Sequence, residues 1–278
     1  MTAIRLLKER PWGIVGAVIL LVVILLAILA PLITPYFYNE ISIDNRLVPP
    51  GHGFLMGTDN LGRDIFSRLV YGTRPYVAVA LMAVGTATLL GFLLGILSAC
   101  ARGKTDAFLR RAVFVPAILL AVVFLLLITV RTSSLPLLMI NVNYDARLFI
   151  IFSGLLLSSV FLPSVYVITR EAISPAFGRR IMPLLPLTLV NVGLAIGVAV
   201  LFIALLSFYG LGVPPPTPEW GNMIGGAGRR YLITAPWTVL WPSLAIIITG
   251  LGSLLFAVAL REIWVVRPPR PFDASEQK

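Results

Sequence analysis

Long runs of apolar residues, separated by short polar segments, follow one another along the whole chain. A helix needs roughly 20 apolar residues to cross a bilayer core about 30 Å thick. Several runs come close to that length, at residues 12–33, 76–99, 113–130, 148–169, 183–206 and 238–260. The pattern therefore predicts an all-α integral membrane protein with six transmembrane helices.

The first apolar run follows Arg5, Lys8 and Arg10, as the apolar core of a secretion signal would. Signal peptides, however, have an apolar region of only about 7–15 residues. Because the run 12–33 is longer, we expect a first span that is retained in the mature chain.

Composition supports a membrane environment and changes the meaning of the net charge. Only 12% of the residues are charged and 58% are hydrophobic, whereas soluble domains carry about 25% charged residues. In a soluble protein, a net charge of +10 would indicate a nucleic-acid partner. Here the basic residues gather at the ends of the apolar runs, so we expect no nucleic-acid partner and a lipid bilayer around the chain.

Basic residues also predict which side of the membrane each segment faces, because cytoplasmic loops are enriched in Lys and Arg. The compact segments on the N-terminal side of the membrane hold most of them: Arg5, Lys8, Arg10, Arg102, Lys104, Arg110, Arg111, Arg170, Arg179, Arg180, Arg261, Arg267, Arg270 and Lys278. We therefore expect both termini to lie in the cytoplasm. Cys100 is then at the cytoplasmic end of the second span, while Glu219 and Trp220 lie outside.

This topology divides the chain into a cytoplasmic N-terminus (1–11), a first transmembrane helix (12–34), an external loop (35–75), a five-helix core (76–260) and a cytoplasmic tail (261–278). Small residues recur inside the predicted spans: Gly85, Gly91, Gly95, Ser98, Gly193, Ala195, Gly197 and Ala199. Small residues let membrane helices approach closely, so we expect these to mediate helix packing. The alternative is that the glycines line a pathway.

Few side chains offer catalytic or metal chemistry. Cys100 and His52 are the only residues of their types, which leaves no thiolate or histidine cluster for a metal or a disulfide. Residues 98–105 resemble a phosphate-binding loop with its first glycine replaced by serine, but they leave a predicted membrane helix instead of following a strand. We expect no catalytic, cofactor-binding or metal-binding residue in this chain, so that if energy is consumed, another chain must consume it. Charges are nearly absent from the spans, which disfavours an ion-coupled secondary transporter or a channel.

The segment 56–74 combines turn residues with a short helical pattern. Gly57 and Gly62 permit turns, and Asp59 or Asp64 can cap the start of a helix. The apolar positions that follow share one helical face: Ile65, Phe66, Leu69, Val70 and Thr73. We expect an amphipathic helix lying at the outer membrane interface before the second span.

This segment resembles a motif of the C-type permease subunits of dipeptide, oligopeptide and nickel ABC importers, G-T-D-x-x-G-R-D-x-x-S-R-L-x-x-G-x-R. The matching residues are Gly57, Thr58, Asp59, Gly62, Arg63, Asp64, Ser67, Arg68, Leu69, Gly72 and Arg74. A second segment, 206–221, with Ala-Pro-Trp at 235–237, resembles the external loop between the last two spans of the family. Its candidate site residues are Gly210, Gly212, Pro214, Pro215, Glu219, Trp220 and Gly221.

The resemblance implies an importer permease of the type I fold in the bacterial inner membrane. Such a subunit pairs with a homologous second permease, with two cytoplasmic ATPase subunits that bind ATP and Mg, and with an external solute-binding protein. It implies a pathway between the two permeases for peptides or similar small solutes. Dipeptides, longer peptides, nickel complexes and opines all remain open as the solute.

The ATPase-docking loop of the family is expected between the fourth and fifth spans. Its candidate residues here are Arg170, Glu171, Ala172, Gly178, Arg179 and Arg180. This loop is shorter than the family pattern, since only Arg179 and Arg180 separate Gly178 from the ending, and Pro175 interrupts the expected coupling helix. Two alternatives therefore stay open: charges that only fix the topology, and a non-coupling assembly subunit.

Overall fold

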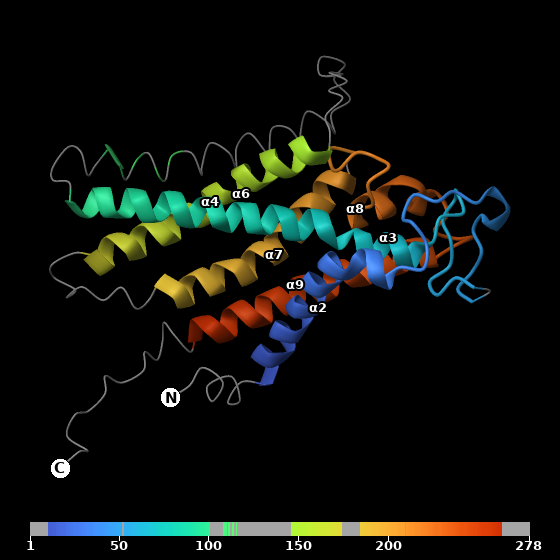
Figure 1. Cartoon of the computed structure of the whole chain (residues 1–278), viewed down its shortest axis with the longest axis horizontal. Helices are drawn as coiled ribbons and strands as arrows, with labels where there is room; N and C mark the ends of the chain where they lie inside the picture. Colours follow the sequence, from blue (N-terminus) through green and yellow to red (C-terminus); the bar gives the residue numbers. More distant parts are fainter. Residues whose placement is uncertain are drawn as a thin grey trace, which may run out of the picture.

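The computed structural model describes residues 11–262, apart from 52, 101–107, 110, 112, 114, 116–145, 174–183 and 209. Every named element within these residues is helical (Figure 1). The elements are α2 (Pro11–Ile33), η1 (Ile43–Asn45), α3 (Ile65–Tyr71), α4 (Thr73–Cys100), α6 (Ala146–Ile173), α7 (Leu184–Phe208), α8 (Trp220–Met223), η4 (Ile224–Gly228) and α9 (Trp237–Arg261).

Among the described residues, four stretches are long and apolar enough to cross a membrane: Pro11–Ile33, Ile65–Cys100, Leu189–Phe208 and Trp237–Arg261. They fall on the first, second, fifth and sixth predicted spans, and the expectation of an all-helical, multi-pass membrane protein is confirmed for the described residues. The fourth predicted span falls on α6, whose apolar stretch, Ser153–Val167, is shorter. Most of the third predicted span, 113–130, lies outside the described residues, so the count of six stays a prediction.

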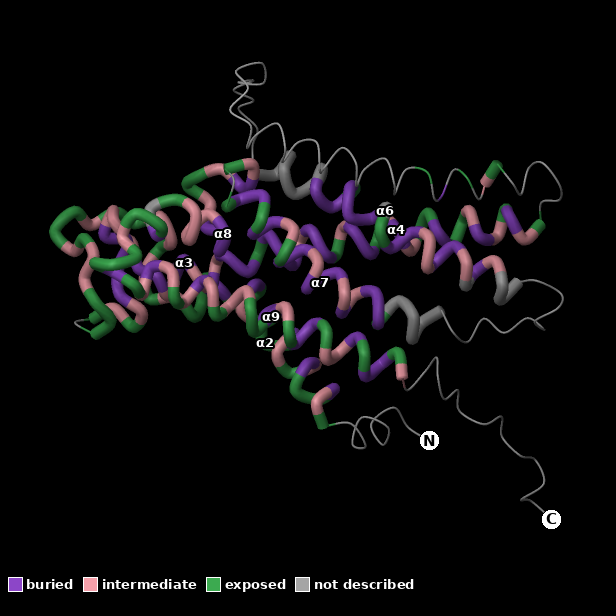
Figure 2. Tube along the Cα trace, turned by 180° about the vertical axis from the view of Figure 1, so that it is seen from behind, coloured by how far each residue is buried: buried purple, intermediate pink, exposed green. Residues whose placement is uncertain are grey.

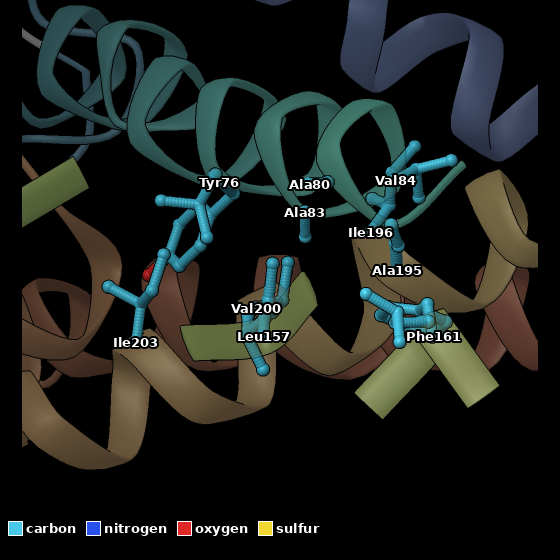
Figure 3. Packing of buried hydrophobic residues seen from close by; sticks show 14 of the residues in the cluster. Tyr76, Ala80, Ala83, Val84, Leu157, Phe161, Ala195, Ile196, Val200 and Ile203 are labelled. Atoms are coloured by element: carbon cyan, nitrogen blue, oxygen red, sulfur yellow. The ribbon is translucent and has the colours of Figure 1, made fainter. Parts of the chain in front are cut away.

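Helix α7 occupies the centre of the helical layer. Of its apolar window, 61% is buried, against 33% for each of the other three stretches. It packs against α9 and α4, while α4 packs along α6 and α2 packs along α9. Side chains from α4 face those of α6 and α7 in one apolar cluster (Figure 3). Exposed positions follow the outward sides of the helices (Figure 2), where the surface consists largely of leucine, isoleucine, valine and phenylalanine.

Glycines allow this close packing. A Cβ added to Gly91 of α4 would lie 2.8 Å from Cβ of Val165 in α6, and one added to Gly193 of α7 would lie 2.5 Å from Cδ1 of Phe256 in α9. Real Cβ atoms do not tolerate such distances, so the expectation of helix packing is confirmed at both positions. Gly85 differs, because a Cβ there would meet open space.

The segments that join α2 to α3 and α7 to α9 lie together at one end of the helices (Figure 1). We name residues 34–64 and 210–236 the loop cap. Helices α4 and α9 begin beside the loop cap and run away from it, whereas α7 runs toward it.

Candidate functional site

The first half of the site is a tight turn that the glycines make possible. Gly57 and Gly62 have φ of 79° and 75°, in the left-handed region that favours glycine. A side chain at Gly62 would also collide with the backbone carbonyl of Ser42. Thr58 and Asp64 form an antiparallel bridge across the turn. The predicted turn is confirmed.

Asp59 lies at the centre of this turn. Its Oδ1 accepts hydrogen bonds from the backbone N–H groups of Leu61 (2.8 Å) and Arg63 (3.0 Å). Its Oδ2 lies 2.7 Å from Nε of Arg63 and 3.7 Å from Nε of Arg68. One carboxylate therefore faces two guanidinium groups.

Asp64, and not Asp59, caps the short helix α3. Its Oδ2 accepts from the backbone N–H of Ser67 (2.7 Å) and from the Ser67 hydroxyl (2.6 Å). From the sequence, either aspartate could cap the helix. The structure assigns this role to Asp64, because Asp59 is engaged in the turn.

Helix α3 is covered on more of its circumference than an amphipathic pattern predicts. Ile65 and Val70 are buried as expected, but Ser67 and Arg68 are buried as well. The chain after α2 covers these polar side chains: the backbone N–H of Tyr36 donates to Ser67 Oγ (3.4 Å), and Arg68 Nη1 donates to the carbonyl of Tyr38 (3.2 Å). The polar side of α3 therefore faces protein.

Arg74, the last residue of the first motif, connects α4 to α2. Its Nε donates to the carbonyl of Ala27 at 2.8 Å, and its guanidinium lies 4.9 Å from the centroid of the Tyr71 ring. This arginine is exposed.

The second half of the site is organised by Glu219. Its carboxyl group accepts hydrogen bonds from the backbone N–H groups of Gly221 (2.8 Å) and Asn222 (2.7 Å), and thereby caps α8. The hydroxyl of Tyr76, at the start of α4, donates to the same carboxyl group. Burial raises the pKa of Glu219 to about 8, against the opposing effect of the two backbone donors.

The remaining residues of the second motif shape the turn between α7 and α8. Gly210 has a φ of 76°. A side chain at Gly212 would collide with Ser207, and one at Gly221 would meet the backbone of Ala204. Pro214 and Pro215 follow this turn, and Pro215 lines the cavity described below.

Two tryptophans join the halves of the site. The Nε1–H of Trp220 donates to the carbonyl of Leu69 at 2.9 Å, across 151 positions in the chain. The Nε1–H of Trp237 donates to the carbonyl of Thr58 at 3.2 Å. Glycines admit both rings, since a Cβ at Gly72 would lie 3.0 Å from the Trp220 ring and one at Gly57 would lie 2.8 Å from the Trp237 ring.

A cavity of about 280 Å³ lies between the two halves. Its lining includes Asp59, Arg63 and Arg68 from the first segment and Pro215, Asn222 and Tyr231 from the second. The sequence patterns did not indicate Asn222, Tyr231 or Tyr76 as parts of the site. Tyr76 was expected only as the first residue of a span, and no local pattern distinguishes it from other aromatic residues at a membrane boundary.

The candidate docking loop is only partly described. Arg170, near the end of α6, donates from Nε to the hydroxyl of Ser98 (3.1 Å), which lies 2.8 Å from the hydroxyl of Tyr166. Glu171 and Ala172 belong to α6. The other three candidates, Gly178, Arg179 and Arg180, lie outside the described residues.

These features define a helical, multi-pass membrane protein with a polar loop cap. Residues 2–50 match a family model that is described as the N-terminal TM domain of oligopeptide transport permease C. The dipeptide transport system permease protein DppC of Alkalihalophilus pseudofirmus is 34% identical, over 94% of this chain and 87% of that protein.

Two further relatives are the probable D,D-dipeptide transport system permease protein DdpC of Escherichia coli and the peptide transport system permease protein SapC of Haemophilus influenzae. The first is 31% identical over 93% of this chain and 88% of that protein, and the second is 34% identical over 87% and 86%. The chain belongs to the family of C-type permease subunits of peptide ABC transport systems.

Proposed function

We propose that this chain is one of two transmembrane permeases of an ATP-driven importer. With a homologous second permease it forms the pathway for a peptide, which an external solute-binding protein delivers. Two separate ATPase subunits bind ATP and Mg and supply the energy. The permease itself carries no catalytic group.

The observation that supports this proposal most directly is the joining of the two family segments. The Trp220–Leu69 and Trp237–Thr58 hydrogen bonds hold residues 57–74 and 206–237 as one unit at one end of the helices. The relatives that cover most of the chain are named peptide transport permeases. The apolar outward sides of the helices fit a surface that contacts lipid and a second permease.

The distribution of basic residues supports the orientation. With the loop cap outside, both termini and the end of α4 at Cys100 lie in the cytoplasm, where Lys and Arg are favoured. This orientation places the cap where an external binding protein can reach it.

Uptake of a radiolabelled dipeptide tests the proposal. Cells that lack this chain but keep its partner subunits should lose energy-dependent uptake, and the restored chain should recover it. Normal uptake without the chain would contradict a role in the pathway. Nickel or opine uptake that depends on the chain, without peptide uptake, would assign it to another solute.

Coupling is tested separately at the candidate docking loop. We expect that replacing residues 173–178 with a Gly-Ser stretch leaves the complex assembled and lowers solute-stimulated ATP hydrolysis about tenfold, which corresponds to about 1.4 kcal/mol of lost coupling. Glu171→Lys should act in the same direction. Unaltered transport in both variants would instead identify a non-coupling assembly subunit.

A further inference from the structure

The cavity in the loop cap is larger than a packing defect and has polar walls. Protein interiors contain few voids larger than a water molecule, whereas this cavity measures about 280 Å³. That volume is close to the lower end of the range for ligand pockets, roughly 300–1,000 Å³. A polar space of this size holds either several waters or a small solute.

The cavity wall carries positive charge that the described residues compensate incompletely. Among the described lining residues, Asp59 is the only acidic one, and it faces both Arg63 and Arg68. Its carboxylate is already occupied by two backbone donors and by Nε of Arg63. The other aspartate of the motif, Asp64, uses its Oδ2 at the start of α3 and does not line the cavity.

Arg68 has more hydrogen-bond donors than its described contacts use. It is 5% exposed, its Nε lies 3.7 Å from Asp59 Oδ2, beyond hydrogen-bonding distance, and its Nη1 donates to the carbonyl of Tyr38. A guanidinium has more donors than this one bond uses, and a buried charge without full compensation is costly. An anion in the cavity would supply the missing acceptor in a bidentate arrangement.

Three further arginines lie next to lining residues of the cavity. Arg46 donates to the backbone carbonyl of the lining residue Asn60 at 2.8 Å. The exposed pair Arg229 and Arg230 lies in the chain directly between the lining residues Gly228 and Tyr231. On the proposed outer side, topology does not favour arginines, and attraction of an anionic solute would account for arginines placed next to lining residues of the cavity.

A neutral acceptor completes the pattern. The Oδ1 of Asn60 is buried without a hydrogen-bond partner among the described residues. Asn60 lines the cavity, and rotation of its side chain would turn this buried oxygen toward an amide or ammonium N–H of the same solute. The cavity therefore offers hydrogen-bond donors to a carboxylate and an acceptor to an N–H group. A short peptide carries both of these chemical groups.

We propose that this cavity binds the terminal carboxylate of a short peptide, with Arg68 and Arg63 holding the carboxylate and Asn60 accepting from a peptide N–H. The choice of a peptide rests on the proposed function, whereas the preference for a carboxylate rests on the geometry of the cavity. The site would receive solute at the loop cap.

Direct binding to the purified transporter complex, in nanodiscs and without its external binding protein, tests the site. Saturation-transfer NMR would compare alanyl-alanine, N-acetyl-alanyl-alanine and alanyl-alanine amide. We expect the two carboxylates to bind, and the amide to bind at least tenfold more weakly. Arg63→Gln should raise the Kd of alanyl-alanine at least tenfold and abolish the preference over the amide, while Arg63→Lys retains the preference.

Controls separate binding from folding. Arg74→Gln removes a motif arginine that lies outside the cavity and should leave the preference for the carboxylate unchanged. If Arg63→Gln does not fold, Asn60→Ala provides a second test. This substitution leaves the hydrogen bond from Arg46 in place, because Arg46 donates to the backbone carbonyl of Asn60. It should weaken alanyl-alanine binding severalfold.

Equal affinity for the acid and the amide, or undiminished binding in folded Arg63→Gln and Asn60→Ala, would overturn the proposal. Peptide uptake measured with the same complex separates the two proposals. Uptake with no carboxylate preference in binding refutes only the cavity site. Carboxylate binding that depends on Arg63, without uptake, refutes only the importer function.

Discussion

Glu219→Gln tests whether a buried carboxyl group stabilises the loop cap. Glu219 is fully buried, and burial raises its pKa from 4.5 to about 8. Because a tenfold change in an equilibrium constant corresponds to about 1.4 kcal/mol, full ionisation of the folded side chain costs on the order of 5 kcal/mol relative to the unfolded chain. The net value of one ordinary hydrogen bond is only about 1 kcal/mol.

The sign of the pH dependence follows from the raised pKa. The stabilising contribution is complete below pH 4.5 and is lost as the pH rises through about 8. Glutamine does not titrate, but its amide nitrogen faces one backbone donor of α8, so the variant loses one hydrogen bond, about 1 kcal/mol, at every pH. Near pH 5 the wild type has itself lost about 1 kcal/mol, because the unfolded carboxyl group is already largely ionised there, so Glu219→Gln should match it at that pH and exceed it by roughly 4 kcal/mol near pH 9.

Thermal unfolding of the purified complex, followed by tryptophan fluorescence between pH 5 and pH 9, measures this difference. Glu40→Gln is the matched control, because Glu40 is exposed and the same substitution there should give a curve parallel to the wild type. If Glu219→Gln also runs parallel to the wild type over the whole range, the side chain does not pass from neutral to ionised in the folded protein and the reasoning is refuted.

Three further predictions concern packing and orientation. Trp220→Phe should lower the free energy of unfolding by about 1–2 kcal/mol through loss of its hydrogen bond to α3, whereas Trp241→Phe, whose Nε1 has no partner among the described residues, should cost less. Gly91→Val should reduce the yield of folded complex because α6 leaves no space for a side chain, while Gly85→Ala, which faces open space, should not. An impermeant maleimide should label the exposed Cys100 in inverted vesicles only, and labelling of intact spheroplasts would contradict the proposed orientation.

The site was only partly predictable. The two segments were identified from the sequence as motifs, and the local roles of Gly57 and Gly62 were correctly anticipated, because a left-handed φ depends on the residue itself. That the segments meet could not be inferred, since the Trp220–Leu69 hydrogen bond joins residues 151 positions apart. The docking loop stays a prediction, because half of its candidate residues lie outside the described ones.

By itself, the sequence determined the membrane class and the position of most described helices. Transfer of a segment into lipid depends on the summed hydrophobicity of that segment, and a helix satisfies its own backbone hydrogen bonds, so neither property requires knowledge of the rest of the chain.

Only the tertiary structure decided which polar groups are buried and what they face. The hydrophobic pattern placed Arg68 on the polar side of a short helix, yet the chain after α2 covers it and leaves it beside Asp59 and a cavity. The same holds for Glu219, whose pKa rises because α4 and α8 exclude water from its carboxyl group. Burial and charge compensation depend on neighbours from distant parts of the chain, and the sequence alone does not show which residues become those neighbours.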